Sequence, residues 1–320
     1  MNEIPRISRR RSPNPQTLLR RMGLGSLSAM LLGAALCVAL ASPVAAWHDT
    51  GHMITAQIAY DELTDHARAE VDGLIAILAE EPPHRDHAVT ASVWADDLKR
   101  QGVRIYDHWH YINLPVFGEG LVAHPEPEPR NVVWAIEQAV LILRGDASDH
   151  QKASMLGFLL HFVGDVHQPM HCASRYTREL PTGDRGGNEL KLDHEWSNLH
   201  LFWDDAAGLF PDFDERQWQP NIRRFADDVV RLVPKTSVPQ WRRGDARAWA
   251  WESHGVAVEA AYAGIEDGAK PSPEYVARAR EVARQRLAIG GYRLGALLND
   301  IFGGVAPNPG RDEPERDRKR

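Results

Sequence analysis

Cysteine is nearly absent from this chain of 320 residues. Cys37 and Cys172 are the only two, and Cys37 lies in an N-terminal segment that has the features of an export signal. Cys172 by itself cannot form a disulfide within the chain. The domain that remains after removal of the signal must therefore be stabilised by its hydrophobic core, by bound metal, or by both.

The chain also lacks any sustained alternation of apolar and polar residues, which argues against a large β-sheet. Apolar residues instead recur every three or four positions, which is the period of a helix with one buried face. This pattern extends over residues 53–80, 88–100, 130–145, 150–168, 218–233, 247–264 and 273–302. Breaks rich in proline and glycine separate these segments, and there is no internal repeat. The sequence predicts an all-α fold, built as a single multi-helix domain.

Residues 1–46 have the three parts of a secretory signal peptide. A basic region is followed by an apolar stretch rich in glycine, alanine and serine, and then by the small residues of positions 43–46. We expect cleavage between Ala46 and Trp47, and export to the periplasm or the medium. A permanent membrane anchor is the alternative, because the apolar stretch is nearly long enough to span a bilayer. Arg20 and Arg21 leave the choice between general and twin-arginine export open.

Residues 47–320 carry more acidic than basic side chains. The whole chain has a formal charge of −7, and residues 1–46 contain six arginines and one glutamate, so residues 47–320 carry −12. Such a chain is not expected to have a broad basic surface for nucleic acid. Bound divalent cations could still supply positive charge for a phosphate locally. We expect residues 47–304 to form the functional domain and the charged tail 305–320 to be disordered, since it lacks core-forming residues.

Histidine is as frequent as cysteine is rare: there are 15, all after residue 46. The densest group lies in HFVGDVHQPMH, residues 161–171. His161 and Asp165 are four positions apart and would share one face of a helix. Pro169 should end or bend that helix, so that His171 points in another direction. Imidazole nitrogens and carboxylate oxygens are both ligands that zinc accepts.

A second pair with the same spacing, His200 and Asp204, lies in NLHLFWD at residues 198–204. One such pair is more often an ordinary polar pair than a metal site. Two pairs in apolar surroundings are stronger evidence for a metal site, because buried ionisable groups need a partner or a metal. Cleavage after Ala46 would also give Trp47 a free amine, which can chelate a metal together with its carbonyl oxygen. The earlier candidate ligands are Trp47, His52, Asp96 and His110.

As an ordered set, these motifs resemble the single-strand-specific zinc nucleases of the S1/P1 family. The resemblance implies a fold of the zinc phospholipase C/single-strand nuclease type and a catalytic domain over residues 47–304. The matching pieces are Trp47-x4-His52, the Trp-Ala-Asp ending at Asp96, His110-Tyr111, HFVGDVHQPMH, Gly186-Gly187-Asn188 and NLHLFWD.

The same resemblance implies three bound Zn²⁺ ions. One ion would be bound by Asp96, His110, His161 and Asp165. A second would be bound by the amine and carbonyl of Trp47, by His52 and by Asp165, so that Asp165 bridges the pair. The third would be bound by His171, His200 and Asp204, leaving coordination positions open for water and substrate.

Residues next to these ligands are candidates for contacts with the substrate. Asn188 resembles a phosphate-side asparagine of the family and is expected to act in catalysis with Asp96 and Asp165. Tyr111 matches an aromatic position on which a base stacks. Asn113 stands where some members carry an aspartate that bonds the base edge, so the base preference stays open. Lys99 could add a phosphate contact. Core packing of Tyr111, a turn role for Asn188 and a solvated helix face for Lys99 remain alternatives.

The activity implied is an exported phosphodiesterase that hydrolyses single-stranded RNA or DNA, with 3′-nucleotides as a further substrate class, to 5′-phosphate products. We expect a monomer with no membrane partner after cleavage. The nearest alternative is a zinc-dependent phospholipase C, against which the short gap from Trp47 to His52, Asp204 in place of a glutamate, and the Asn188 loop all argue. A non-catalytic exported zinc-binding protein is the other alternative, although all nine matched ligand positions are filled.

Overall fold

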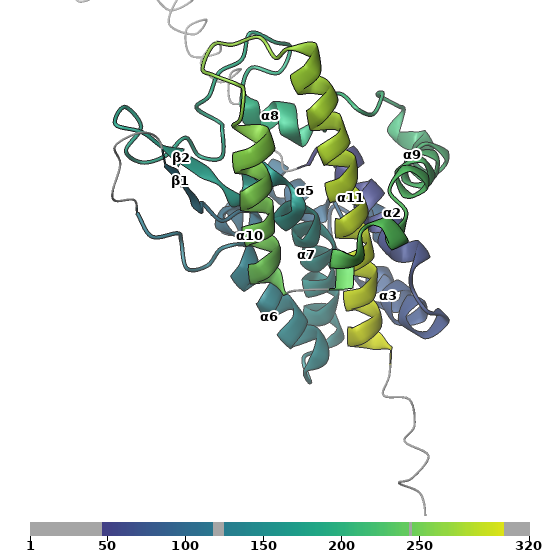
Figure 1. Ribbon diagram of the computed structural model, residues 1–320. Coiled ribbons are helices and arrows are strands. Elements are labelled where there is room, and N and C mark those ends of the chain that lie inside the picture. Colours follow the sequence, from purple (N-terminus) through teal and green to yellow (C-terminus); the bar gives the residue numbers. More distant parts are fainter. Residues whose placement is uncertain (1–46, 118–124, 243–244, 304–320) are drawn as a thin grey trace, which may run out of the picture. The chain divides into compact units, whose positions relative to one another are not determined.

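The structure is a computed structural model that describes residues 47–117, 125–242 and 245–303, all within one compact unit. The expected signal at 1–46 and the expected disordered tail at 305–320 lie outside the described residues. Helices make up most of the described chain, as the apolar periodicity predicts (Figure 1). The all-α prediction is therefore confirmed. None of the helices within the described ranges is both long and apolar enough to cross a membrane.

The elements follow one another as listed here: α2 (Asp49–Asp61), α3 (Asp65–Leu78), α4 (Ala88–Ala91), α5 (Trp94–Arg100), the 3-10 helix η2 (Asp107–His110), β1 (Pro115–Phe117), α6 (Val132–Arg144), α7 (Asp149–His167), the 3-10 helix η3 (Pro169–Cys172), β2 (Ser174–Tyr176), α8 (Leu199–Asp204), the 3-10 helix η4 (Glu215–Gln217), α9 (Trp218–Leu232), the 3-10 helices η5 (Lys235–Ser237) and η6 (Pro239–Arg242), α10 (Ala246–Val256), the π-helix η7 (Ala257–Ala261) and α11 (Pro273–Phe302).

Helix starts coincide with capping residues in the sequence. The side chain of Thr64 accepts a hydrogen bond from the amide of Ala67 at the start of α3. This cap divides the apolar segment 53–80, expected as one unit, into α2 and α3. Ser148 and Gln151 form a capping box at the start of α7, in which each side chain bonds the other residue's main chain. Caps of this kind satisfy amides that have no partner within their own helix.

Helix α7 lies at the centre of the fold. It contacts α2, α3, α4, α5, α6, α10 and α11 (Figure 1). All residues from Leu156 to His167 are buried, so the C-terminal part of α7 is enclosed around its whole circumference. A helix that is apolar on all sides is stable only when other elements surround it. His161 and Asp165 are therefore placed in the protein interior.

The two strands lie in segments that the sequence marks only as breaks between helices. β1 and β2 form a parallel pair of three residues each, with Pro115 opposite Ser174. Just before the strands, the amide of Ile112 donates to the carbonyl of His171 at 2.8 Å. This contact brings the segment that follows η2 beside the segment that follows α7.

Candidate metal centre

All candidate ligands except Trp47 would bind through their side chains. These eight side chains come from six helices. His52 is on α2, Asp96 on α5, His110 on η2, His161 and Asp165 on α7, His171 on η3, and His200 and Asp204 on α8. All eight side chains belong to buried residues. They form three groups in which the candidate ligand atoms lie within 4.8 Å of one another: His52, His161 and Asp165; Asp96, His110 and His161; and His171, His200 and Asp204.

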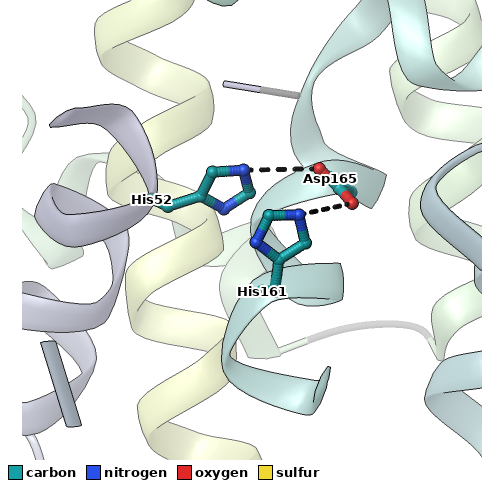
Figure 2. A group of neighbouring side chains, drawn as sticks. All are labelled: His52, His161 and Asp165. Carbon is teal, nitrogen blue, oxygen red and sulfur yellow. Dashed lines mark ion pairs between the residues drawn. The ribbon is translucent and has the colours of Figure 1, made fainter. Parts of the chain in front are cut away.

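Asp165 occupies the middle of the cluster. Its Oδ1 lies 3.5 Å from Nε2 of His52 and 3.4 Å from Nδ1 of His171. Its Oδ2 lies 3.1 Å from Nδ1 of His110 and 3.3 Å from Nε2 of His161. Figure 2 shows the two oxygens facing different histidines. One carboxylate thus faces ligands of all three groups, which is the arrangement that a bridging role requires.

Main-chain carbonyls orient three of the histidine rings. Nδ1 of His161 donates to the carbonyl of Ser92, Nδ1 of His171 to that of His110, and Nδ1 of His200 to that of Gly186, each at 2.7 Å. In the neutral ring, a nitrogen that donates in this way leaves the opposite nitrogen, Nε2, as a lone-pair donor. In all three rings Nε2 lies close to a carboxylate of the cluster.

Several of these buried atoms have no hydrogen-bond partner among the residues that the structure describes. They are both ring nitrogens of His52, both oxygens of Asp96, Oδ1 of Asp165, Nε2 of His171, Nε2 of His200 and Oδ2 of Asp204. Buried polar atoms normally have partners, because burial without one costs roughly 1–3 kcal/mol for each group. Atoms of this kind, collected at one place and all of types that zinc binds, fit a metal site.

The electrostatics of the cluster favour bound cations. Burial lowers the pKa of His52 well below its usual range, so the ring is neutral and keeps a lone pair for a metal. Burial would also lower the pKa of His171, but Asp165 and Asp204 outweigh it and raise the pKa to about 9. Burial alone would raise the pKa of Asp165, whereas His161 and His171 hold it well below its usual range. Asp165 therefore stays ionised and attracts positive charge.

Trp47 is fully buried beside this cluster. Its indole Nε1 donates to the carbonyl of Gly164 in α7 at 3.0 Å, and the amide of His48 donates to the carbonyl of Asp204 at 2.9 Å. The start of the described chain is thus attached to α7 and to α8, both of which carry candidate ligands.

Glycine is required at two points of close approach. A Cβ at Gly164 would lie 2.7 Å from Nδ1 of His52, so α2 could not approach α7 as closely. A Cβ at Gly186 would lie 2.4 Å from the carbonyl oxygen of Met170, and Gly186 also has a positive φ of 67°. Its carbonyl is the one that orients His200. The Gly-Gly-Asn loop therefore supports a candidate ligand, in addition to the role expected for its asparagine.

The candidate substrate residues lie around the same cluster. The main chain of Tyr111, directly after His110, is extended. A tight turn at Asn113 follows, where the amide of Leu114 donates to the carbonyl of Ile112 at 3.0 Å. Lys99 lies close enough to His200 to lower its pKa, although burial has the larger effect. The amide of Asn188 donates to the carbonyl of Arg185 at 2.7 Å, which holds its side chain in the loop. Tyr111, Asn113, Lys99 and Asn188 are all partly or fully accessible in this arrangement, unlike the ligands.

The structure also shows the contacts of Cys172 and Gln168, two uncharged residues within the motif that carries His161, Asp165 and His171 or next to it. Cys172 follows a candidate ligand, but its thiol donates to the carbonyl of Val166 at 3.4 Å, and burial raises its pKa to about 12. It is therefore a protonated thiol within the core. Gln168 was missed, although it contacts Asp204 directly, with its Nε2 donating to Oδ1 at 2.6 Å. The available signal was an uncharged polar residue inside an otherwise apolar and ligand-rich motif.

Comparison with known proteins matches residues 47–303 to the family described as S1/P1 Nuclease. Endonuclease 2 of Arabidopsis thaliana is 29% identical, over 80% of this chain and 91% of that protein. Nuclease S1 of Aspergillus oryzae is 22% identical, over 84% of this chain and 96% of that protein. Nuclease P1 of Penicillium citrinum is 25% identical, over 49% of this chain and 60% of that protein. The chain therefore belongs to the S1/P1 nuclease family and is a hydrolase that acts on ester bonds of nucleic acid.

Proposed function

We propose that this protein is an exported zinc-dependent nuclease that cuts single-stranded RNA and DNA, and also 3′-nucleotides, to products with a 5′-phosphate. The observation that carries the proposal is the meeting of three buried His/Asp groups at Asp165, with partnerless ligand atoms turned toward one another in the described residues. The sequence similarity to proteins named as endonucleases and as nuclease S1 supports the substrate class.

The chain offers the nine ligands that three zinc ions would need. In the proposed assignment, Asp96, His110, His161 and Asp165 hold one ion, and Asp165 also reaches a second ion held by His52 and by the amine and carbonyl of Trp47. His171, His200 and Asp204 hold the third ion. When bound, zinc supplies Lewis acidity, which activates water for attack on phosphorus and stabilises charge on phosphate oxygens.

The remaining residues bind and orient the substrate. Lys99, on the helix that carries Asp96, supplies a positive charge to a phosphate oxygen in an otherwise acidic domain. Asn188 presents its amide from the rigid Gly-Gly-Asn loop, where Arg185 already fixes the direction of one N–H bond. Tyr111 offers a ring on which a base stacks whatever its identity, since every base has a π-face. Asn113, two residues after Tyr111, meets the base edge with both a donor and an acceptor.

Purification of the processed protein tests this function. We expect three zinc ions per chain, cleavage of single-stranded RNA and DNA in preference to duplex DNA, and 5′-phosphate ends on the products. Phosphatidylcholine serves as the control substrate, because its hydrolysis would indicate a phospholipase C. A zinc-loaded protein that cleaves neither single strands nor 3′-nucleotides would instead be a non-catalytic zinc-binding protein.

Processing at Ala46 should be part of forming the site. A protein beginning at Ala46 has a peptide nitrogen in place of the basic amine of Trp47, so we expect it to lose affinity for the second zinc. Loss of one contact near a metal weakens binding roughly 10- to 100-fold, and loss of a direct ligand should do at least as much. Zinc titration of proteins that begin at Ala46 and at Trp47 measures the difference. Equal zinc content and equal turnover would show that the free amine is not a ligand.

A further inference from the structure

Gln168 is a fully buried polar residue that the proposed ligand set does not use. It follows the last residue of α7 and precedes Pro169, so its main chain leaves the helix for an extended conformation. Buried amides are almost always hydrogen-bonded, and the partners of such a residue indicate what it holds in place.

The partners of Gln168 all belong to segments that carry candidate ligands. Its side-chain Nε2 donates to Oδ1 of Asp204 at 2.6 Å, and its Oε1 accepts from the amide of Met170 at 2.5 Å. Its main-chain amide donates to the carbonyl of Asp165 at 3.0 Å, and its carbonyl accepts from the amide of His171 at 3.1 Å. One residue therefore links the end of α7, the 3-10 helix η3 and the end of α8.

The two oxygens of Asp204 differ as a result. Oδ1 receives the N–H of Gln168 at 2.6 Å, and Nε2 of His171 lies farther from it, at 3.6 Å. Oδ2 lies 3.4 Å from Nε2 of His200 and has no hydrogen-bond partner among the described residues. Because the amide of Gln168 already takes up a lone pair of Oδ1, Oδ2 is the oxygen better placed to bind a metal.

We propose that Gln168 is a positioning residue for the third zinc of the proposed function: its amide fixes Asp204 as a ligand through Oδ2 only. Binding through one oxygen leaves more positions on the ion for water and for a phosphate oxygen, and open positions are what a catalytic zinc requires. Groups that hold a ligand in this way are part of how proteins tune a bound metal. The role rests on the proposed function, because it presupposes a zinc at His171, His200 and Asp204.

The substitution Gln168→Glu separates the two side-chain bonds. Glutamate keeps an oxygen for the amide of Met170, but it replaces the N–H donor with a second oxygen facing Asp204. Gln57→Glu is the matched control, since Gln57 is also buried and its Nε2 donates to Oδ1 of Asp61 at 3.1 Å, in a pair outside the three groups. Zinc affinity is measured by competition with a chelator, and the absorption spectrum of the cobalt-substituted protein reports coordination at each site.

We expect Gln168→Glu to weaken one of three metals roughly 10- to 100-fold and to alter the cobalt spectrum, while Gln57→Glu binds all three as the unchanged protein does. Gln168→Met, which has no donor and only a weak sulfur acceptor, should give the same loss. Wild-type affinity for all three metals in either folded variant would overturn the proposal. So would failure of both variants to fold while Gln57→Glu folds, because Gln168 would then serve the fold. Absence of a third zinc from the unchanged protein would instead refute the proposed function itself.

Discussion

Two His–Asp pairs with the same spacing are held in place by different means. His161 and Asp165 lie 3.3 Å apart on α7, and His200 and Asp204 lie 3.4 Å apart on α8. α7 has 19 residues and contacts seven other α-helices, whereas α8 has six residues and contacts the 3-10 helix η3. The spacing of four therefore sets the geometry within each pair, but it does not set where the pair lies in the fold.

The supports of the two pairs show this difference directly. On α7, packing of apolar residues around the helix fixes the position of the pair. On α8, Leu199, Phe202 and Trp203 are also fully buried in a core cluster. Hydrogen bonds add to that packing: Gly186 orients His200, Gln168 holds the side chain of Asp204, and the amide of His48 donates to the carbonyl of Asp204. The site thus combines the His161–Asp165 pair, which packing around a long helix holds in place, with the His200–Asp204 pair, where polar contacts add to the packing. The predictions below test this contrast.

The largest effect is expected at the point where the groups meet. Asp165→Asn removes a charge that faces four histidines, so we expect loss of two zinc ions and a fall in turnover of more than about 100-fold, beyond the range for residues that only support a ligand. Asp204→Asn should release only the third ion. Metal analysis of the two purified variants gives the comparison. If Asp165→Asn keeps its zinc content and rate, Asp165 does not bridge.

Gly164→Ala tests the close approach of α2 to α7. The added Cβ would lie 2.7 Å from Nδ1 of His52, whose ring stacks on His161 at 3.8 Å between ring centroids. We expect the histidine to be displaced, and zinc at its group to bind roughly 10- to 100-fold more weakly. Zinc competition measures this change.

Gly73→Ala is the control for Gly164→Ala, because a Cβ at Gly73 meets no atom within 4 Å in the described part of the chain. Gly73 lies within α3, where alanine should raise the free energy of unfolding by about 0.5–1 kcal/mol and leave zinc binding unchanged. Equal zinc affinity in both variants would mean that the interior can accommodate the methyl group without moving His52.

The smallest effects concern the helix caps, and here the α7 pair and the α8 pair should respond differently in zinc affinity. Ser148→Ala removes the cap of α7, and Asn198→Ala removes the bond from the side chain of Asn198 to the amide of Leu201 at the start of α8. Each should lower the free energy of unfolding by about 1 kcal/mol, as urea titration measures. Only Asn198→Ala should also weaken zinc binding. Equal zinc affinities would show that α8 is as firmly held as α7.

Most of the candidate site follows from short-range patterns in the sequence. The His161–Asp165 and His200–Asp204 pairs follow from helical period, and the separate direction of His171 follows from Pro169. The roles of Gln168, Gly164 and the carbonyl of Gly186 could not be predicted in this way. Their partners lie far away in the chain or belong to the main chain, which looks the same at every residue.

The amino-acid sequence by itself determined which segments are helical, where caps and prolines end them, and which histidines and aspartates share a helix face. These features depend on covalent geometry and on bonds within a few residues. Only the tertiary structure decided that His52, His110 and His171, from three other helices, meet Asp165 and His161 of α7. It also decided that carbonyls of Ser92, His110 and Gly186 orient three of the histidine rings. That convergence arises from burial of apolar faces between distant segments, which no local pattern contains.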